Sequence, residues 1–328
     1  MTAAEPTTAM ATTYSEHVSE LVVAGREPVA DGVVSLVLEH PDGAELPTWT
    51  PGAHVDLLLA PDLTRQYSLC GSPSDLTRWR VGVLLDHGGR GGSRHVHEQL
   101  EVGSRLRVRG PRNHFPLVAS ERYLFVAGGI GITPLLPMVA QAEQAGADWT
   151  LYYGGRRRGS MAFLDELAPY GDRVQVVPQD EYGLLDLPTF LGDPRPGVRI
   201  YSCGPAPLLA AIAETCAQLP PGALRVERFV AQAAPAPVRS TAFEVELART
   251  GATVTVTLDM TIVDALGHVG VEVLTSCRRG VCGTCETTVL EGRPDHRDAL
   301  LDADERDAAD CMYVCVSRAI SDRLVLDL

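Results

Sequence analysis

The first third of the chain alternates apolar and polar residues in short runs that are separated by glycine and proline. The runs cover residues 33–40, 54–60, 65–71, 79–85 and 104–111. Alternation with a period of two buries one face of a strand, and closely spaced turns favour a barrel or a sandwich. A helix is expected to begin near Ser93. We therefore predict a β-barrel domain over residues 15–118.

Residues 119–230 follow a different rhythm, in which apolar strands alternate with helical segments. Strands are predicted at 122–129, 149–155, 173–177, 198–204 and 225–229, and helices at 133–146, 160–167 and 207–219. Thr133 is a suitable N-cap for the first of these helices, and Pro134 suits its first turn. The alternation predicts an α/β domain with a parallel sheet.

The segment 231–240 breaks this pattern with small residues and two prolines, which is typical of a linker. Beyond it, residues 241–328 predict a small third domain with strands at 243–250, 252–259 and 323–328. Residues 1–14 contain no basic residue and no continuous apolar core, so we expect a disordered arm and no secretory signal. The predicted architecture is multidomain.

Charge limits the partners that this chain can have. The formal net charge is −14, and residues 241–328 carry −8 of it, from eight arginines and sixteen carboxylates. This balance argues against nucleic acid or an anionic membrane as the main partner. All 28 basic residues are arginines, so Schiff-base chemistry on lysine is excluded. Phosphate groups must be bound by arginine forks, helix N-termini and backbone amides.

Cysteine spacing is the strongest chemical signal. Cys277, Cys282 and Cys285 form a C-x4-C-x2-C pattern, and Cys315 follows after 29 residues. This is the spacing of a plant-type [2Fe–2S] cluster, whereas a zinc ribbon has two similar C-x2-C pairs. The fourth ligand is Cys315 or the nearby Cys311. Without a signal peptide, late cysteines favour a metal site in a reducing cytoplasm over disulfides.

A [2Fe–2S] cluster accepts one electron at a time, whereas a nicotinamide donates two as a hydride. A flavin can exchange electrons in either way, so the upstream domains are expected to hold a flavin and a dinucleotide. Four segments suit these ligands: RQYSL at 65–69, GGRGGS at 88–93, VAGGIGITPL at 126–135 and YSCGPAPLL at 201–209. Glycine-rich turns that join a strand to a helix bring bare amides close to phosphate. The third segment is not the Rossmann G-x-G-x-x-G.

In this order, RQYS, GRGGS, GGIGITP, CGP and the cysteine pattern closely resemble the phthalate dioxygenase reductase family, which includes vanillate demethylase reductases. The resemblance covers about residues 15–328. It implies an FMN-binding β-barrel, an NAD-binding α/β domain and an α+β β-grasp ferredoxin domain. A segment for the adenosine of FAD is missing after residue 93, which favours FMN. The CVSRA motif of the family falls at 315–319 and selects Cys315 as the fourth ligand.

The resemblance also implies roles for individual residues. Ser68 and Cys203 are expected beside the atoms that exchange the hydride. The residues implied to hold the flavin are Arg65, Gln66, Tyr67, Ser68, Leu84, Leu85, Gly91, Gly92, Ser93 and Phe229. Those implied to border the nicotinamide are Gly128, Gly129, Gly131, Thr133, Cys203, Gly204 and Pro205. Arg156 follows a strand where the adenosine ribose should lie; NADH is expected, and the arginine leaves NADPH possible.

The resemblance implies an electron-transfer reductase that passes electrons from NAD(P)H through FMN and the cluster to an oxygenase. The acceptor is a Rieske-type dioxygenase or demethylase, or a haem-thiolate monooxygenase, bound transiently by a cytoplasmic monomer. Two other hypotheses remain: a redox carrier or sensor that uses the cluster without NAD(P)H turnover, and a zinc-stabilised dehydrogenase. Hydride passes from nicotinamide C4 to flavin N5, and no side chain needs to act as acid or base in that step.

Overall fold

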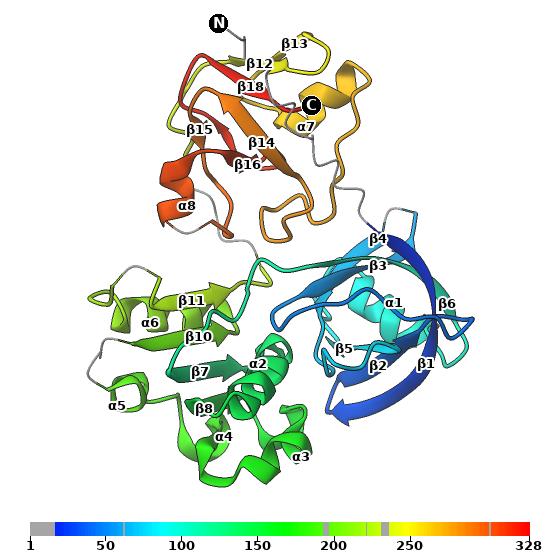
Figure 1. The fold of residues 1–328 in the computed structure, drawn as a ribbon, viewed down its shortest axis with the longest axis vertical. Coiled ribbons are helices and arrows are strands. Elements are labelled where there is room, and N and C mark those ends of the chain that lie inside the picture. Colours follow the sequence, from blue (N-terminus) through cyan, green and yellow to red (C-terminus); the bar gives the residue numbers. More distant parts are fainter. Residues whose placement is uncertain (1–16, 62, 193–196, 221, 231–235, 302) are drawn as a thin grey trace, which may run out of the picture.

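The computed structural model describes residues 17–328 except 62, 193–196, 221, 231–235 and 302. Three larger sheets, one for each predicted domain, succeed one another along the chain (Figure 1). The predicted arm at 1–14 and the first half of the predicted linker lie outside the described residues. No helix in the described part of the chain is long and apolar enough to span a membrane.

The first sheet is an antiparallel barrel of six strands in the order β4-β3-β6-β1-β2-β5. A bridge between Leu69 and Val81 brings the end of β4 to β5 and closes the sheet. Alternate residues of each strand fill the interior around Trp79, and helix α1 (Gly92–Gln99) covers one end. The strands are β1 (Val18–Ala30), β2 (Val33–Glu39), β3 (His54–Ala60), β4 (Leu63–Ser68), β5 (Arg78–Leu84) and β6 (Arg105–Arg112).

The second sheet is parallel, in the order β11-β10-β7-β8-β9, as the alternating pattern predicts. Its strands are β7 (Arg122–Gly128), β8 (Asp148–Gly155), β9 (Val174–Pro178), β10 (Val198–Cys203) and β11 (Leu224–Glu227). Its helices are α2 (Ile132–Gln144), α3 (Leu164–Leu167), α4 (Gln179–Tyr182), α5 (Leu187–Leu191) and α6 (Ala206–Thr215), with 3-10 turns at Gly129–Gly131, Arg158–Ser160 and Ala168–Arg173.

Two predicted helices of this domain are wrong in extent. The segment 160–167 is helical only over Leu164–Leu167, because Phe163 has a positive φ of 63° and turns its ring, with Met161, into the core. The helix predicted at 207–219 ends at Thr215. In the segment 160–167, burial of Met161 and Phe163 prevails over helix formation, since a continuous helix would not place both of these side chains against the sheet.

The third sheet is mixed, in the order β13-β12-β18-β14-β16, with only the β12–β18 pair parallel. Helix α7 (Ile262–His268) packs its apolar face on this sheet, and Thr261 and Asp264 form a capping box at its start. This is the α+β arrangement expected of a β-grasp domain. The elements are β12 (Phe243–Leu247), β13 (Thr253–Val256), β14 (Glu286–Glu291), β15 (Pro294–Asp295), β16 (Cys311–Tyr313), β17 (Arg318–Ala319), β18 (Arg323–Leu326) and α8 (Ala303–Ala308).

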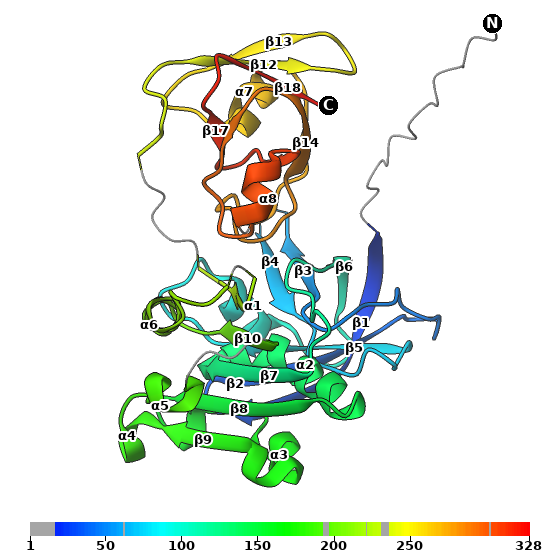
Figure 2. The same cartoon turned by 60° about the vertical axis from the view of Figure 1, so that its left-hand side comes forward.

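The third domain sits on the other two. In Figures 1 and 2 its lower loops lie over β3 and β4 of the barrel and beside β11 of the parallel sheet. The contact is made by residues 275–285, which we call the cysteine loop. Ser276 of this loop donates a hydrogen bond to Asp56 of β3 (3.2 Å). The fold therefore brings the predicted cluster ligands to the predicted flavin strand.

Candidate functional site

The predicted flavin strand and the predicted phosphate loop are in direct contact. Arg65 on β4 donates from Nη2 to the carbonyl of Arg90 (2.6 Å) and lies across Gly92. A Cβ atom at Gly92 would overlap with the Arg65 side chain, so only glycine allows this approach. The guanidinium and the first amides of α1 therefore converge, as binding of a phosphate group requires.

Two details of this region differ from expectation. Ser93 is not the cap of α1: the helix begins at Gly92, and Gly91 takes the N-cap position with a φ of 83°. The Ser93 hydroxyl instead accepts a hydrogen bond from the Asp86 amide (3.0 Å), which ties the helix to the preceding turn. The Leu85 amide donates to the carbonyl of Gly32 (2.8 Å), so this amide is already engaged within the barrel.

The two glycine-rich turns of the parallel sheet pack on each other. A Cβ atom at Gly131 would overlap with the carbonyl of Cys203, and one at Gly128 would lie 2.6 Å from Pro205 Cδ. A Cβ atom at Gly204 would lie 3.0 Å from Gly128 Cα. These glycines are needed because the backbones of neighbouring strand ends touch, which places both turns at one edge of the sheet.

Thr133 does not cap α2, because the helix begins one residue earlier, at Ile132, and its N-cap is Gly131. The Thr133 hydroxyl donates to the carbonyl of Ile130 (3.0 Å). Its methyl group lies against Gly82 of the barrel strand β5. Thr133 therefore stands at the boundary between the predicted flavin and dinucleotide domains.

Glu227 is a candidate functional residue that the sequence analysis missed. It ends β11 directly beside Cys203 of β10, and its carboxyl group is hydrogen-bonded to the side chains of Ser68 and Cys203. Its Oε2 atom is buried with no hydrogen-bond partner in the described part of the chain. Burial raises the pKa of Glu227 to about 8, against the opposing effect of the two hydrogen bonds. Burial also raises the pKa of Cys203.

One pocket collects residues from all three domains. Its walls come from β4, from the loop with Arg90, from the end of β11 and from the cysteine loop, and the residues are Thr64, Arg65, Gln66, Ser68, Arg90, Glu227, Arg228, Phe229, Ser276, Cys277 and Val281. Phe229 is 42% exposed at its rim. An aromatic ring left this accessible beside a pocket can cover a planar ligand. The structure thus brings Arg65, Gln66, Ser68, Phe229 and Cys277 together.

Other predicted residues lie outside this pocket. Leu84 is 40% exposed at the end of β5, and Tyr67 is mostly buried beside the barrel core, where burial raises its pKa. Arg156 is exposed after β8, at the same edge of the parallel sheet as the two glycine turns. Neighbouring Arg158 pairs with Glu181 (3.5 Å). Arg156 is therefore accessible to a ligand, whereas Arg158 is already paired with a carboxylate.

The four predicted cluster ligands form two pairs. The thiol of Cys277 is hydrogen-bonded to that of Cys282, and the thiol of Cys285 to that of Cys315. Two thiolates for each of two irons is the arrangement that a [2Fe–2S] cluster needs, so these residues fit that group.

Backbone amides surround these sulfurs. The Arg279 amide donates to Cys277 Sγ (3.2 Å), and the Cys277 amide donates to Cys282 Sγ (3.5 Å). The hydrogen bond from the Cys277 thiol lowers the pKa of Cys282 to about 6, which favours the thiolate. Gly280 has a φ of 69°, and a Cβ atom there would lie 2.7 Å from Val316. The loop is therefore shaped to hold negative sulfur.

Cys311 lies apart from this group. It begins β16 opposite Thr288 of β14, and burial raises its pKa to about 12. Cys311 is also not one of the four paired thiols. The pairing of Cys285 with Cys315 therefore agrees with the choice of Cys315.

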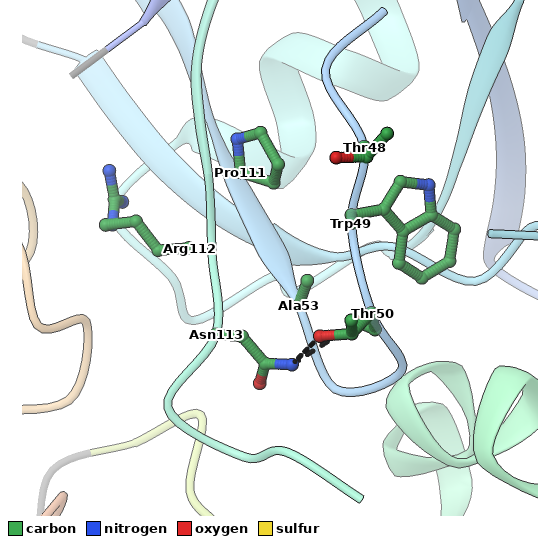
Figure 3. A pocket seen from close by; sticks show the side chains of 7 residues that line it. All are labelled: Thr48, Trp49, Thr50, Ala53, Pro111, Arg112 and Asn113. Atoms are coloured by element: carbon green, nitrogen blue, oxygen red, sulfur yellow. Dashed lines mark hydrogen bonds between the residues drawn. The ribbon is translucent and has the colours of Figure 1, made fainter. Parts of the chain in front are cut away.

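A second pocket lies where the loop before β3 meets the end of β6, and it contains none of the predicted site residues (Figure 3). Asn113 donates there to Thr50 Oγ1 (2.8 Å) and to the carbonyl of Pro51 (3.0 Å). The lining residues are Thr48, Trp49, Thr50, Ala53, Pro111, Arg112 and Asn113. These hydrogen bonds fix the segment that follows β6.

Comparisons with known proteins agree with this geometry. Residues 245–319 match the family model of the 2Fe-2S iron-sulfur cluster binding domain. The chain is 44% identical over 301 residues to the phenoxybenzoate dioxygenase subunit beta of Ectopseudomonas oleovorans, covering 91% of this chain and 94% of that protein.

Two solved structures are similar over almost the whole chain. A phthalate dioxygenase reductase, described as a modular structure for electron transfer from pyridine nucleotides to [2Fe-2S], is 33% identical with a TM-score of 0.69, covering 95% of this chain and 98% of that one. An intact type IV self-sufficient cytochrome P450 monooxygenase is 45% identical with a TM-score of 0.91, covering 95% of this chain but 41% of that longer one. The chain therefore belongs to the phthalate dioxygenase reductase family, as an NAD(P)H-dependent flavin and iron–sulfur oxidoreductase of an oxygenase system.

Proposed function

We propose that this chain takes hydride from NADH at the pocket beneath Phe229 and delivers electrons singly, through Cys277, Cys282, Cys285 and Cys315, to a Rieske-type oxygenase. One observation carries the proposal: residues of the flavin strand, the carboxyl group of Glu227 and the cluster ligand Cys277 line the same pocket. Electron transfer from a flavin to a [2Fe–2S] cluster requires the flavin site and the cluster ligands to be adjacent.

The barrel residues hold and orient the flavin. Arg65 and the amides of Gly91, Gly92 and Ser93 would bind its phosphate, and Gln66 and Ser68, which line the pocket on β4, would hold the ring. Tyr67 supports this strand from the side of the barrel core. Bound FMN accepts two electrons together and releases them one at a time. Phe229, which lines this pocket and is partly exposed, would cover the flavin ring and exclude water from it.

The parallel sheet orients the nicotinamide. The turns at Gly128–Gly131 and Cys203–Pro205 pack together and present their amides at one edge of the sheet. Cys203 is buried and uncharged, so it contributes shape without competing for the hydride. Arg156 lies at the same edge and binds the adenosine ribose. Positioning of the two rings, and not acid catalysis, supplies the rate of this step.

The electrons and the proton of the hydride leave by different routes. The electrons leave through the cysteine loop, of which Cys277 lines the pocket. The proton that remains must be released, and the Ser68 hydroxyl is hydrogen-bonded to the Glu227 carboxyl group. Ser68 would pass this proton to the carboxylate form of Glu227, whose population grows as the pH rises through its pKa of about 8, and Glu227 would then release the proton to solvent.

The acceptor docks transiently on the acidic third domain, which implies a basic face on the oxygenase and binding that weakens with salt. A haem-thiolate monooxygenase is the second candidate, because the similarity to the self-sufficient monooxygenase structure is as strong as that to any relative reported above. Product formation with each class of oxygenase, measured at equal reductase concentration, decides between them.

The visible spectrum of the purified protein tests the proposal. We expect flavin peaks on a broad iron–sulfur shoulder, with faster bleaching by NADH than by NADPH. Faster bleaching by NADPH would reverse the assignment of the coenzyme and give Arg156 a 2′-phosphate to bind. A coloured protein without flavin that ignores both nucleotides would indicate a redox carrier, and a colourless zinc protein would indicate a dehydrogenase.

Replacing Arg65 with alanine is expected to weaken FMN binding about a hundredfold, since a charge-assisted phosphate contact contributes roughly 2–3 kcal/mol. The dissociation constant can be measured by titrating FMN into the flavin-depleted variant. Arg107→Ala is the matched control, because Arg107 is exposed on β6 of the same barrel. Equal FMN affinity for the two variants would refute the phosphate contact.

A further inference from the structure

His114 of the barrel domain lies against the cysteine loop at Gly283. Gly283 and Thr284 are the two residues between the predicted ligands Cys282 and Cys285. Gly283 has a φ of 74°. A Cβ atom at Gly283 would overlap with Nε2 of His114. The loop between two cluster ligands therefore rests directly on a side chain of the other domain, with no room for another carbon.

A second histidine supports the first. The rings of His54 and His114 are stacked with centroids 5.7 Å apart, and His114 meets the edge of Tyr313 at 6.2 Å. His54 is 2% exposed, and its side chain interacts with the backbone of Cys282, one of the predicted cluster ligands. The two stacked rings therefore lie at the boundary between the barrel and the cysteine loop.

A buried ion-pair network joins the same loop to the barrel. Asp56 is fully buried and pairs with Arg109 (2.7 Å) and Arg112 (2.8 Å). Across the domain boundary, Ser276 donates to Asp56 (3.2 Å), and Arg109 donates to the carbonyl of Thr275 (3.4 Å). These contacts end directly before Cys277, so the loop is held on both sides of its first two ligands.

The histidine is itself fixed in place. Asn113 donates to Thr50 (Figure 3) and to the carbonyl of Pro51. Its side-chain oxygen accepts a hydrogen bond from the Phe115 amide (2.9 Å), so the residues on both sides of His114 are anchored. A side chain that is anchored on a rigid strand end can define the position of a neighbouring loop.

We propose that His54, Asp56, Arg109, Arg112 and His114, which we call the barrel contact surface, position the cysteine loop for electron transfer from the flavin. The inference rests on the proposed function and assigns these residues a positioning role, since none of them lines the flavin pocket. The surface sets the rate at which each electron crosses from the barrel to the cluster, and hydride transfer to the flavin is independent of it.

The test is a double-mutant cycle between Gly283→Ala and His114→Ala, read by anaerobic stopped-flow absorption with NADH. We expect Gly283→Ala to slow cluster reduction at least tenfold, because a displacement of about 1 Å is costly at such a contact, and to leave flavin reduction within twofold. His114→Ala should slow cluster reduction only two- to threefold. The double variant should be faster than Gly283→Ala alone, because the overlap is gone and only the strain of alanine at a φ of 74° remains.

Hydrogen–deuterium exchange of peptides covering residues 275–285 gives a readout that does not depend on turnover. Exchange should be faster in Gly283→Ala and return toward wild type in the double variant. Gly251→Ala is the control, since Gly251 has a φ of 69° in the same domain with no atom within 4 Å of its added Cβ. Iron content and the visible spectrum verify cluster assembly in each variant.

Additive effects in the cycle, or unchanged exchange in Gly283→Ala, would overturn the inference. If Gly283→Ala does not assemble a cluster, the same measurements are made on Ser276→Ala, which loses the hydrogen bond to Asp56. Wild-type rates of cluster reduction and of exchange in Ser276→Ala would also overturn the inference. Failure of NADH to reduce the wild-type flavin would instead refute the proposed function. The exchange measurements would still test the contact between His114 and the cysteine loop.

Discussion

Replacing Cys315 with alanine is expected to abolish electron delivery to the acceptor while leaving the flavin reducible by NADH. Cys315 is paired with Cys285, so its loss leaves one iron with a single thiolate. Turnover with a one-electron acceptor should fall more than a hundredfold, and the iron–sulfur shoulder of the visible spectrum should disappear. Flavin bleaching by NADH should persist, because the residues that line the flavin pocket are unchanged in this variant.

Cys311→Ala provides the matched control for this prediction. Cys311 lies in the β16 ladder, four positions before Cys315, and is not one of the paired thiols. This variant should retain the cluster spectrum and turnover within about twofold of wild type. Loss of the cluster in Cys311→Ala with retention in Cys315→Ala would reverse the ligand assignment.

Replacing Glu227 with glutamine is expected to lower turnover about a hundredfold and to remove its pH dependence in the neutral range. The proton acceptor must be the carboxylate, so wild-type turnover should rise as the pH increases through the pKa near 8 and then level off. Glutamine cannot accept the proton at any pH in this range. Steady-state rates between pH 6 and about pH 9 at saturating NADH measure both effects.

The same raised pKa has a consequence for stability. A carboxyl group that holds its proton more tightly in the folded state than in the unfolded state makes the folded protein less stable as the pH rises through this range. Glu227→Gln should therefore unfold at a temperature that depends less on pH than wild type does. Glu244→Gln, an exposed carboxylate of β12, should alter neither profile. A Glu227→Gln variant with the wild-type pH profile of turnover would contradict the proton route.

Patterns local in sequence could predict the architecture. Alternating apolar residues located β2 and β3 at their observed positions, and the strand–helix rhythm located every strand of the parallel sheet to within about two residues. Helix starts were less predictable: Ser93 and Thr133 both have good capping side chains, but in each case the glycine two residues earlier adopts the N-cap position. Close packing of backbones at both turns favours glycine over a capping hydroxyl.

The candidate site could be predicted only where its residues form a recognisable motif. The cysteine spacing and RQYS are such motifs. Glu227 stands two residues before Phe229, yet its importance depends on the register that places it beside Cys203, and β-register across a parallel pair is not readable from one sequence. His54 and His114 form no recognisable motif, since they lie 60 positions apart and their contact with the cysteine loop exists only in the folded chain.

The central claim is that electrons pass from nicotinamide to flavin to cluster within one polypeptide. Anaerobic stopped-flow absorption with NADH tests it most directly, with flavin and cluster bands followed at several protein concentrations. The account predicts that the flavin is bleached first and that the cluster follows at a rate independent of protein concentration. Cluster reduction that precedes flavin reduction, or whose rate rises in proportion to protein concentration, would contradict it.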